Sequence, residues 1–441
     1  MTDATASNPG RSKTSLLSED THTRRRNAAE TRFKALGIGA VAIGLIFLVI
    51  LITAILRNGI PAFSRTEVQV NFVLTQEQYD TAEKSVLKTS EYTKLFSTYV
   101  ADYAKRQGAE VEITSKALTR ILGKVGGDIR SYYRENPDQI GKEVSFDLSA
   151  SSRADAYING EISRDGFVSS RFLELGDLDV IDSLKQAGII RTGLDTTFLF
   201  GADAGVDNPG GAGIGASVVG SFFMMMVVLF LALPISVAAS IYLEEFAPKN
   251  RVTDLIEVNI SNLAAVPSIV FGILGLAVFI QFMHLPQSAP LVGGLVLTLM
   301  TLPTIIIATR ASLRAVPPSI RDAALGVGAS KMQTVFHHVL PLAAPGILTG
   351  TIIGLAQALG ETAPLLLIGM VGFVARGYPD SFVGGFTEAN SVMPAQIYTW
   401  ASRADPGFYE KAWGGIIILL LFLLTMNIVA VILRRRFERR W

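Results

Sequence analysis

The sequence predicts an all-α polytopic membrane protein with six transmembrane helices and one α+β domain inserted outside the cytoplasm. The 441-residue chain is 49% hydrophobic and only 17% charged, which separates it from soluble globular proteins and from disordered chains. Six apolar runs are long enough, at about twenty residues or more each, to cross a bilayer. The basic residues beside these runs alternate between the two sides of the membrane, as the positive-inside rule requires.

The six runs follow one another with a single long interval after the first. The predicted spans are Leu36–Leu56, Gly215–Leu243, Ile256–Phe282, Leu291–Thr309, Leu342–Phe373 and Trp413–Leu433. A hydrophilic arm over residues 1–34 precedes the first transmembrane helix, residues 35–57, which we therefore interpret as an anchor and not as a cleaved signal peptide. A five-helix core follows over residues 213–433, and residues 434–441 form a basic tail.

The basic clusters place both termini in the cytoplasm. They are Arg24, Arg25, Arg26, Arg32 and Lys34 before the first span, and Arg434, Arg435, Arg436, Arg439 and Arg440 after the last. The short loop after the third span contains neither lysine nor arginine, so the alternation holds inside the core as well. Residues 58–212 are then expected to form a periplasmic insertion domain. The net charge of +1 gives no indication of nucleic-acid binding.

The insertion domain combines helical and strand patterns. Thr75 and Gln78 form a capping box for a long helix, and residues 114–136 read as a second helix. The alternation over residues 143–168 predicts short strands, with turns at Asn159-Gly160 and Asp165-Gly166. We expect a small α+β domain.

The sequence offers no pattern for catalysis or for a metal site. Asp203 and Asp207 do not have the spacing of an EF-hand loop, so we interpret their glycine-rich segment as a linker. His337 and His338 point in different directions on a helix, and no third ligand is nearby. The Walker A pattern is absent, so the chain cannot supply a P-loop ATPase of its own.

The cytoplasmic loop over residues 310–342 carries helix signals. We expect a first helix that ends near Gly326 or Gly328, where glycine allows left-handed backbone, and a second helix that Pro341 ends. Ala323 and Ala324 give the first helix a surface of small side chains. The capping residues are Ser319 with Asp322 for the first helix and Ser330 with Gln333 for the second.

The spacing within this loop resembles the signature E-A-A-x3-G-x9-I-x-L-P of type I ABC importer permeases. Asp322 replaces the glutamate, and His338 stands where an apolar residue is usual. The resemblance implies a core of one plus five transmembrane helices and a coupling helix that docks on an ATP-hydrolysing subunit. The residues that it assigns to ATPase coupling are Asp322, Ala323, Ala324, Gly328, Leu340 and Pro341.

The fifth span combines a small-residue face with a carboxylate. The small residues recur every four positions, which permits close helix packing: Gly346, Gly350, Gly354 and Ala358. Gln357 and Glu361 form a polar ridge beside them. An ionised side chain at this depth costs at least ~2.5 kcal/mol, so Glu361 should face protein or a water-filled cavity. A role in transport and a structural hydrogen bond or ion pair that fixes helix packing both satisfy that requirement.

The segment Gly360–Leu366, "GETAPLL", resembles a signature of the PstA family, permease subunits of bacterial phosphate ABC importers. "ILTG" at residues 347–350 and "NPGGAGIGASVVGS" at residues 208–221 are also similar to that family. The resemblance implies a non-catalytic subunit whose substrate pathway includes Glu361, Gln357 and Thr362. Family members often carry arginine where Gln357 stands, and their outer segment is usually more compact.

The same resemblance implies the partners. They are a second permease (PstC-like), two copies of an ATPase (PstB-like) that uses ATP and Mg, and a periplasmic phosphate-binding protein (PstS-like). The chain itself is expected to bind no cofactor. An importer of another oxyanion or of phosphonate, a membrane sensor and a proton-coupled transporter are the alternatives, but none of them accounts for both the loop signature and the GETAP segment.

Overall fold

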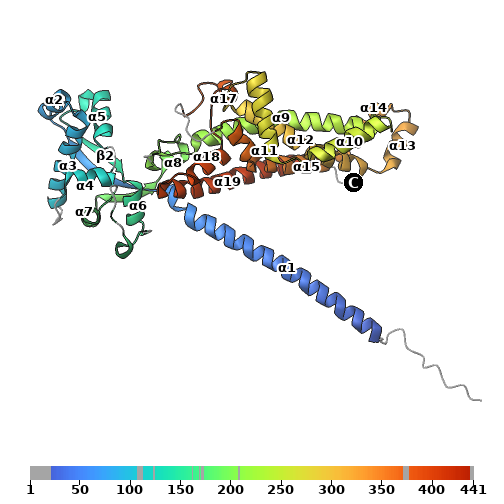
Figure 1. Ribbon diagram of the computed structural model, residues 1–441, viewed down its shortest axis with the longest axis horizontal. Coiled ribbons are helices and arrows are strands. Elements are labelled where there is room, and N and C mark those ends of the chain that lie inside the picture. Colours follow the sequence, from blue (N-terminus) through green and yellow to red (C-terminus); the bar gives the residue numbers. More distant parts are fainter. Residues whose placement is uncertain are drawn as a thin grey trace, which may run out of the picture. The chain divides into compact units, whose positions relative to one another are not determined.

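The computed structural model describes residues 21–106, 113–122, 125–160, 162–167, 169, 173–206, 209–370 and 377–437 (Figure 1). The chain divides into two units, residues 1–56 and residues 57–441. The first unit consists of most of helix α1, Thr21–Gly59. The large apolar side chains of α1 are mostly exposed, among them Leu45 and Phe47 at 57% and 68%. Such a surface is suited to lipid rather than to water.

Five helices in the described part of the chain are long and apolar enough to cross a membrane. They run over Arg24–Phe63, Gly215–Phe246, Pro290–Arg314, Lys331–Gly360 and Pro406–Arg436. A pair of helices bent by 101° makes a sixth when it is counted as one span. The fold class predicted from the sequence is therefore confirmed, and the differences lie in the third and fifth spans.

The third predicted span is not one continuous helix. Helix α10 covers Arg251–Leu263, and after a break α11 covers Ser268–Gly275 and continues as a π-helix over Leu276–Phe282. Pro267 occupies the N-cap of α11. A proline has no N–H to donate to the preceding turn and disfavours helical backbone in the residue before it, which favours a break at this point.

The fifth predicted span is also interrupted. Helix α15, Leu340–Gly360, ends before Glu361, and a short helix α16 follows over Ala363–Leu367. Pro364 lies in the first turn of α16, where its missing N–H costs nothing. The predicted fifth span is present over Lys331–Gly360, but its helix ends thirteen residues before the predicted end at Phe373. The last predicted residues, 371–373, lie outside the described part of the chain.

The small-residue face of α15 packs against α12, Pro290–Arg314, as predicted. A Cβ atom added to Gly346 would lie 2.3 Å from Ser312 Oγ, and one added to Gly350 would lie 2.3 Å from Ala308 Cβ. On its other side α12 packs along α9, Gly215–Ile241 (Figure 1). There Ser240 Oγ donates to the Ile306 carbonyl at 3.2 Å. Close backbone approach and such hydroxyl bonds hold membrane helices together.

The insertion domain is built on a three-stranded antiparallel sheet in the order β2-β1-β3. The strands are β1 Ser64–Val73, β2 Glu143–Ser149 and β3 Ile190–Leu194. The helices are α2 Gln76–Lys84, α3 Lys88–Arg106, α4 Ser115–Leu122, α5 Val125–Glu135, α6 Ser152–Ile158 and α7 Leu175–Gln186. Alternate residues of β1 and β2, such as Val70 and its partner Phe146, are buried in one core. The α+β prediction is confirmed.

Several details of this domain differ from the sequence prediction. The capping box of Thr75 and Gln78 is present, but the helix ends at Lys84 and a second one begins at Lys88. Within residues 143–168 only β2 is a strand among the described residues, because α6 occupies the predicted second strand. Asn159-Gly160 forms the turn after α6, with Gly160 at φ +79°. The turn signal was correct, but it ends a helix instead of joining two strands.

Three short helices and one long helix complete the described elements. The short ones are α8 Thr196–Phe200, α17 Gly384–Thr387 and α18 Met393–Ala401, and the long one is the membrane helix α19, Pro406–Phe437. Lys411 of α19 is buried, and its Nζ donates to Asp195 Oδ2 at 2.7 Å and to the Ala62 carbonyl at 3.2 Å. Asp195 also caps α8 by accepting from the Phe198 N–H at 2.9 Å. One ion pair therefore ties the base of the domain to the last membrane helix.

Asp203 has a structural role that the linker interpretation missed. Its carboxylate accepts from Trp400 Nε1 at 2.7 Å and from Arg403 Nη2 at 2.6 Å. The Arg403 guanidinium also lies over the Phe408 ring. The carboxylate is therefore committed to a buried ion pair and is not available as a calcium ligand. Asp207 lies outside the described residues.

Candidate functional site

The predicted coupling loop begins with a short exposed helix, α13, Pro318–Gly326. It ends as expected, because Gly328 adopts φ +91°, which only glycine tolerates well. A second helix, α14, then starts at the predicted capping box: Ser330 Oγ accepts from the Gln333 N–H at 3.2 Å, and Gln333 Oε1 accepts from the Ser330 N–H at 2.8 Å. The first helix, the turn and the start of the second are therefore confirmed. The predicted cap of the first helix is not: Pro317 is its N-cap, Ser319 lies within the helix, and no side chain caps its start.

Pro341 does not end the second helix, which is a correction to the prediction. Helix α14, Lys331–Thr334, passes into a π-helical turn over Val335–Val339 and then directly into α15. Pro341 lies in the first turn of α15. The π-turn shifts the hydrogen-bond register, so the chain stays helical where a regular α-helix would need a donor that proline lacks. Leu340 and Pro341 thus begin a membrane helix.

The residues predicted to couple to an ATPase differ in exposure. Asp322, Ala323 and Gly328 are exposed, whereas Ala324 is buried and Leu340 and Pro341 are half-buried. Sequence reasoning missed the large apolar side chains that this loop exposes. These are Leu325 at 48% exposure, Val327 at 86%, Met332 at 58% and Phe336 at 45%. Apolar residues in a loop that should be hydrophilic were the available signal, and such a patch is typical of a protein interface.

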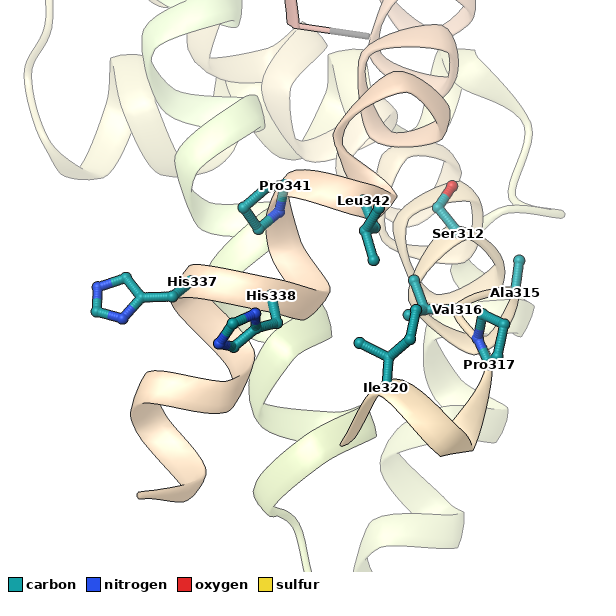
Figure 2. A pocket seen from close by; sticks show the side chains of 9 residues that line it. All are labelled: Ser312, Ala315, Val316, Pro317, Ile320, His337, His338, Pro341 and Leu342. Carbon is teal, nitrogen blue, oxygen red and sulfur yellow. The ribbon is translucent and has the colours of Figure 1, made fainter. Parts of the chain in front are cut away.

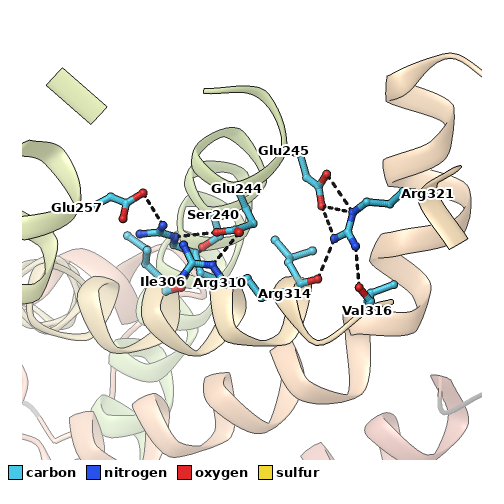
Figure 3. A network of polar contacts seen from close by, with 10 residues as sticks. Ser240, Glu244, Glu245, Glu257, Ile306, Arg310, Arg314, Val316 and Arg321 are labelled. Atoms are coloured by element: carbon cyan, nitrogen blue, oxygen red, sulfur yellow. Dashed lines mark hydrogen bonds and ion pairs between the residues drawn. The ribbon is translucent and has the colours of Figure 1, made fainter. Parts of the chain in front are cut away.

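The loop is fixed to the membrane helices by a network of ion pairs (Figure 3). Glu244 accepts from Arg314 Nε at 2.7 Å and from Arg310 Nε at 3.3 Å, and Arg310 also pairs with Glu257 of α10 at 2.5 Å. Glu245 accepts from Arg321 Nη2 at 2.7 Å. The sequence signal was present and was not used: two acidic residues end one span, and arginines end another.

A cavity of about 620 Å³ lies between the end of α12, α13 and the π-turn (Figure 2). It is lined by Ser312, Ala315, Val316, Pro317, Ile320, His337, His338, Pro341 and Leu342. The two imidazole rings point in different directions in Figure 2, with His337 turned away from Ile320. In the part of the chain that the structure describes, no group of three potential ligands could hold a metal ion.

The predicted pathway residues lie at the break between α15 and α16. Glu361 has extended backbone at the C-cap of α15, and Thr362 is the N-cap of α16. Both are half-buried, and Gln357 is exposed one turn earlier. No described side chain forms a hydrogen bond or an ion pair with the Glu361 carboxylate. The structural alternative, an ion pair within this chain, therefore finds no support among the described residues.

The two interrupted helices pack against each other. A Cβ atom on Gly272 of α11 would lie 2.7 Å from Pro364 Cα, and one on Gly275 would lie 3.4 Å from the Ile368 side chain. The chain thus brings two segments with interrupted helical hydrogen bonding side by side. Non-helical backbone at membrane depth is tolerated where it is buried in protein or lines a water-filled cavity, and the second option is the geometry that a transport pathway needs.

Two models of known protein families match different parts of the chain. A family model described as "Binding-protein-dependent transport system inner membrane component" matches residues 232–441. A second model, described as a domain of unknown function (DUF3333), matches residues 20–166. The first covers most of the membrane core. The second covers α1 and much of the insertion domain.

Individual relatives match the core. "Probable ABC transporter permease protein YqgI" of Bacillus subtilis is 30% identical over 50% of this chain and 77% of its own length. "Phosphate transport system permease protein PstA 1" of Mycobacterium tuberculosis is 30% identical over 52% of this chain and 72% of its own. A solved inward-facing MetNI methionine ABC transporter is 15% identical, with a TM-score of 0.39, over 50% of this chain and 95% of its own. The chain belongs to the PstA family of ABC transporter permeases.

Proposed function

We propose that this chain is one of two permease subunits of an ATP-driven importer of inorganic phosphate in the bacterial inner membrane. The observation that carries the proposal is α13. This short helix buries only Ala324, is held by the ion pair of Arg321 with Glu245, and lies in a loop with exposed apolar side chains such as Leu325 and Val327. A surface of this kind suits an ATPase partner on the cytoplasmic side, and relatives named as phosphate permeases share the core.

The pathway would run beside the two helix breaks. Glu361 lies there without a partner among the described residues, next to Thr362 and one turn from Gln357. A carboxylate repels an anion, so we propose that a basic residue of the second permease balances Glu361. Gln357 would then donate hydrogen bonds to the substrate where other family members use arginine.

The complex would contain the partners that the family resemblance implies. They are a second, PstC-like permease, two PstB-like ATPase subunits and a PstS-like periplasmic phosphate-binding protein. ATP and Mg would be used by the ATPase subunits, and this chain would bind neither. Closure of the ATPase pair would displace α13 and switch the pathway between its inward-facing and outward-facing states.

The experiment is vanadate-sensitive, ATP-dependent uptake of radiolabelled phosphate into proteoliposomes that contain the four kinds of subunit. Gly328→Trp tests the coupling loop, and Gly141→Trp is its matched control. Both glycines have a positive φ, +91° and +84°, with no atom within 4 Å of an added Cβ, but Gly141 lies in the insertion domain. We expect Gly328→Trp alone to lose uptake and to release the ATPase.

Two results would count against the proposal. If ATP hydrolysis responds to another anion while phosphate is not taken up, the substrate is wrong and the architecture stands. If Gly328→Trp keeps both its ATPase and its uptake, α13 is not the coupling element.

Glu361→Gln tests the pathway residue separately. The amide keeps the size of the side chain and removes its charge, so we expect assembly to be retained and phosphate uptake to fall. Undiminished phosphate uptake by the fully assembled variant would show that Glu361 has no role in the substrate pathway.

A further inference from the structure

The helical turn that follows α9 contacts the coupling loop on both sides of α13. It is a π-helical turn over Tyr242–Phe246 that contains Glu244 and Glu245 side by side. Glu244 pairs with arginines of α12, and Glu245 pairs with Arg321 of α13 (Figure 3). Phe246, the next residue, lies under the Lys331 ammonium at 5.2 Å, at the start of α14. One turn of helix therefore contacts the segments before, within and after the predicted ATPase contact.

Arg321 is the centre of this arrangement. Its Nη2 and Nε donate to Glu245 Oε1 at 2.7 and 3.2 Å. Its Nη1 also donates to the Val316 carbonyl at 2.7 Å, and its Nη2 to the Leu313 carbonyl at 2.9 Å. These carbonyls belong to the end of α12 and the residues just after it, where helical carbonyls lack intrahelical partners. A single guanidinium thus joins α9, α12 and α13.

The ion pair between Arg321 and Glu245 is largely shielded from water. Glu245 is 8% exposed and Arg321 is 22% exposed, so water screens the pair much less than it screens a surface ion pair. Helix α13 has nine residues and buries only Ala324, and the half-buried Ile320 packs against a small apolar cluster that includes Leu313 and Val335. Isolated helices of this length are also unstable in water. The polar contacts of Arg321 therefore add directional restraint to a small apolar contact.

We propose that Arg321 and Glu245 are positioning residues that make α13 move as one body with the cytoplasmic ends of α9 and α12. A force applied to α13 is then transmitted to the membrane helices instead of being lost by rotation of α13. Lysine cannot replace Arg321, because a single ammonium lacks the planar fork that reaches a carboxylate and two carbonyls together. The inference rests on the proposed contact of α13 with an ATPase.

The test uses the assembled importer with Arg321→Gln and, from the other side of the pair, Glu245→Gln. The control is Arg130→Gln in the insertion domain. Arg130 also has a two-pronged contact with a glutamate, Glu83, at 2.7 and 3.2 Å, and its exposure, 26%, is close to that of Arg321. The first readout is the amount of phosphate taken up per ATP hydrolysed. We expect it to fall about fivefold or more in both loop variants and to hold in the control, while ATP hydrolysis continues.

The second readout does not depend on the substrate. The chain has no cysteine, so spin labels can be placed at Phe230→Cys on α9 and Ser319→Cys on α13 in the assembled complex. Phe230 is 65% exposed and lies about 22 Å along the helix from Glu245. With Arg321 intact we expect one narrow distance distribution, unchanged between the nucleotide-free and the ATP–vanadate states. Arg321→Gln should broaden it.

The outcomes separate this inference from the proposed function. A narrow, unchanged distance in Arg321→Gln, or an unchanged ratio of phosphate to ATP, would overturn the positioning role. If the parent complex takes up no phosphate but the distance broadens in both loop variants, the joint is supported and the substrate is wrong.

Discussion

Lys411 is a buried charged residue with two hydrogen-bond acceptors. Its ammonium, on α19, has the Asp195 carboxylate and the Ala62 carbonyl as acceptors and lies 4.8 Å from the centre of the Phe198 ring. Removing one partner of a buried pair costs far more than the pair contributes, because the other charge is left without compensation. At the residue scale, then, the stability of the joint between the two parts depends on the pair being complete.

We predict that Lys411→Met lowers the free energy of unfolding by about 3–5 kcal/mol, and that the double variant with Asp195→Asn recovers most of that loss. The measurement is thermal unfolding of the full chain in detergent, followed by tryptophan fluorescence, because Trp400 contacts Phe198 in this joint. Lys34→Met is the control, since Lys34 pairs with Glu30 on the exposed surface of α1. A double variant as unstable as Lys411→Met would contradict the explanation.

Glu83 provides a pH-dependent contribution in the insertion domain. The hydrogen bond from Arg130 lowers the pKa of Glu83 from 4.5 to about 2, against an opposing effect of burial. Because the folded-state pKa is the lower one, the stabilisation is complete above pH 4.5 and is lost as the pH falls towards 2. With partial exposure, we expect about 1 kcal/mol.

Hydrogen exchange of the full chain, corrected for intrinsic rates, checks this expectation. Amides of α3 and α5 should lose protection as the pH falls through this window, and Glu83→Gln should already show the reduced protection at neutral pH. Identical pH dependence in the parent and in Glu83→Gln would assign the effect to another group.

At the scale of elements, apolar length and glycine spacing predicted the membrane helices well. The contact of Gly350 with α12 follows from a repeat of four, which is a local property of the sequence. The breaks at Pro267 and before Pro364, and the continuation through Pro341, depend on where the freed backbone groups find partners. That is decided by neighbouring helices, so a proline alone could not distinguish a break from a π-turn.

Gly350→Ala tests the contact between α15 and α12. Alanine raises helix propensity by about 1 kcal/mol, but here its Cβ would lie 2.3 Å from that of Ala308. We expect a net loss of about 1–3 kcal/mol in unfolding free energy. Gly37→Ala is the control, because no atom lies within 4 Å of its added Cβ. Equal stability of the two variants would show that the helices separate without cost.

For the whole molecule, the sequence predicted the membrane core and the existence of an inserted α+β domain, but not how that domain is built. Strand β1 alternates clearly and was overlooked, because its partners β2 and β3 are distant in sequence. The candidate site was predicted in part. A short signature identified α13, whereas the joint at Arg321 required knowing that Glu245 lies beside it.

The predicted topology can be tested with single cysteines, because the chain has none. Val86 and Val327 are 98% and 86% exposed, the first in the insertion domain and the second beside α13. In intact spheroplasts, a membrane-impermeant maleimide should label Val86→Cys at once. Val327→Cys should react only after the membrane is permeabilised. The reverse pattern would invert the orientation of the whole chain.

The pair of Asp195 and Lys411 also has a consequence for synthesis of the protein. The two residues are 216 positions apart, and Lys411 belongs to the last membrane helix. The base of the insertion domain must therefore leave the ribosome with an uncompensated carboxylate, which stays so until residue 411 has been translated. A nascent or truncated chain that lacks α19 cannot form this ion pair, so completion of the joint requires that α19 is in place.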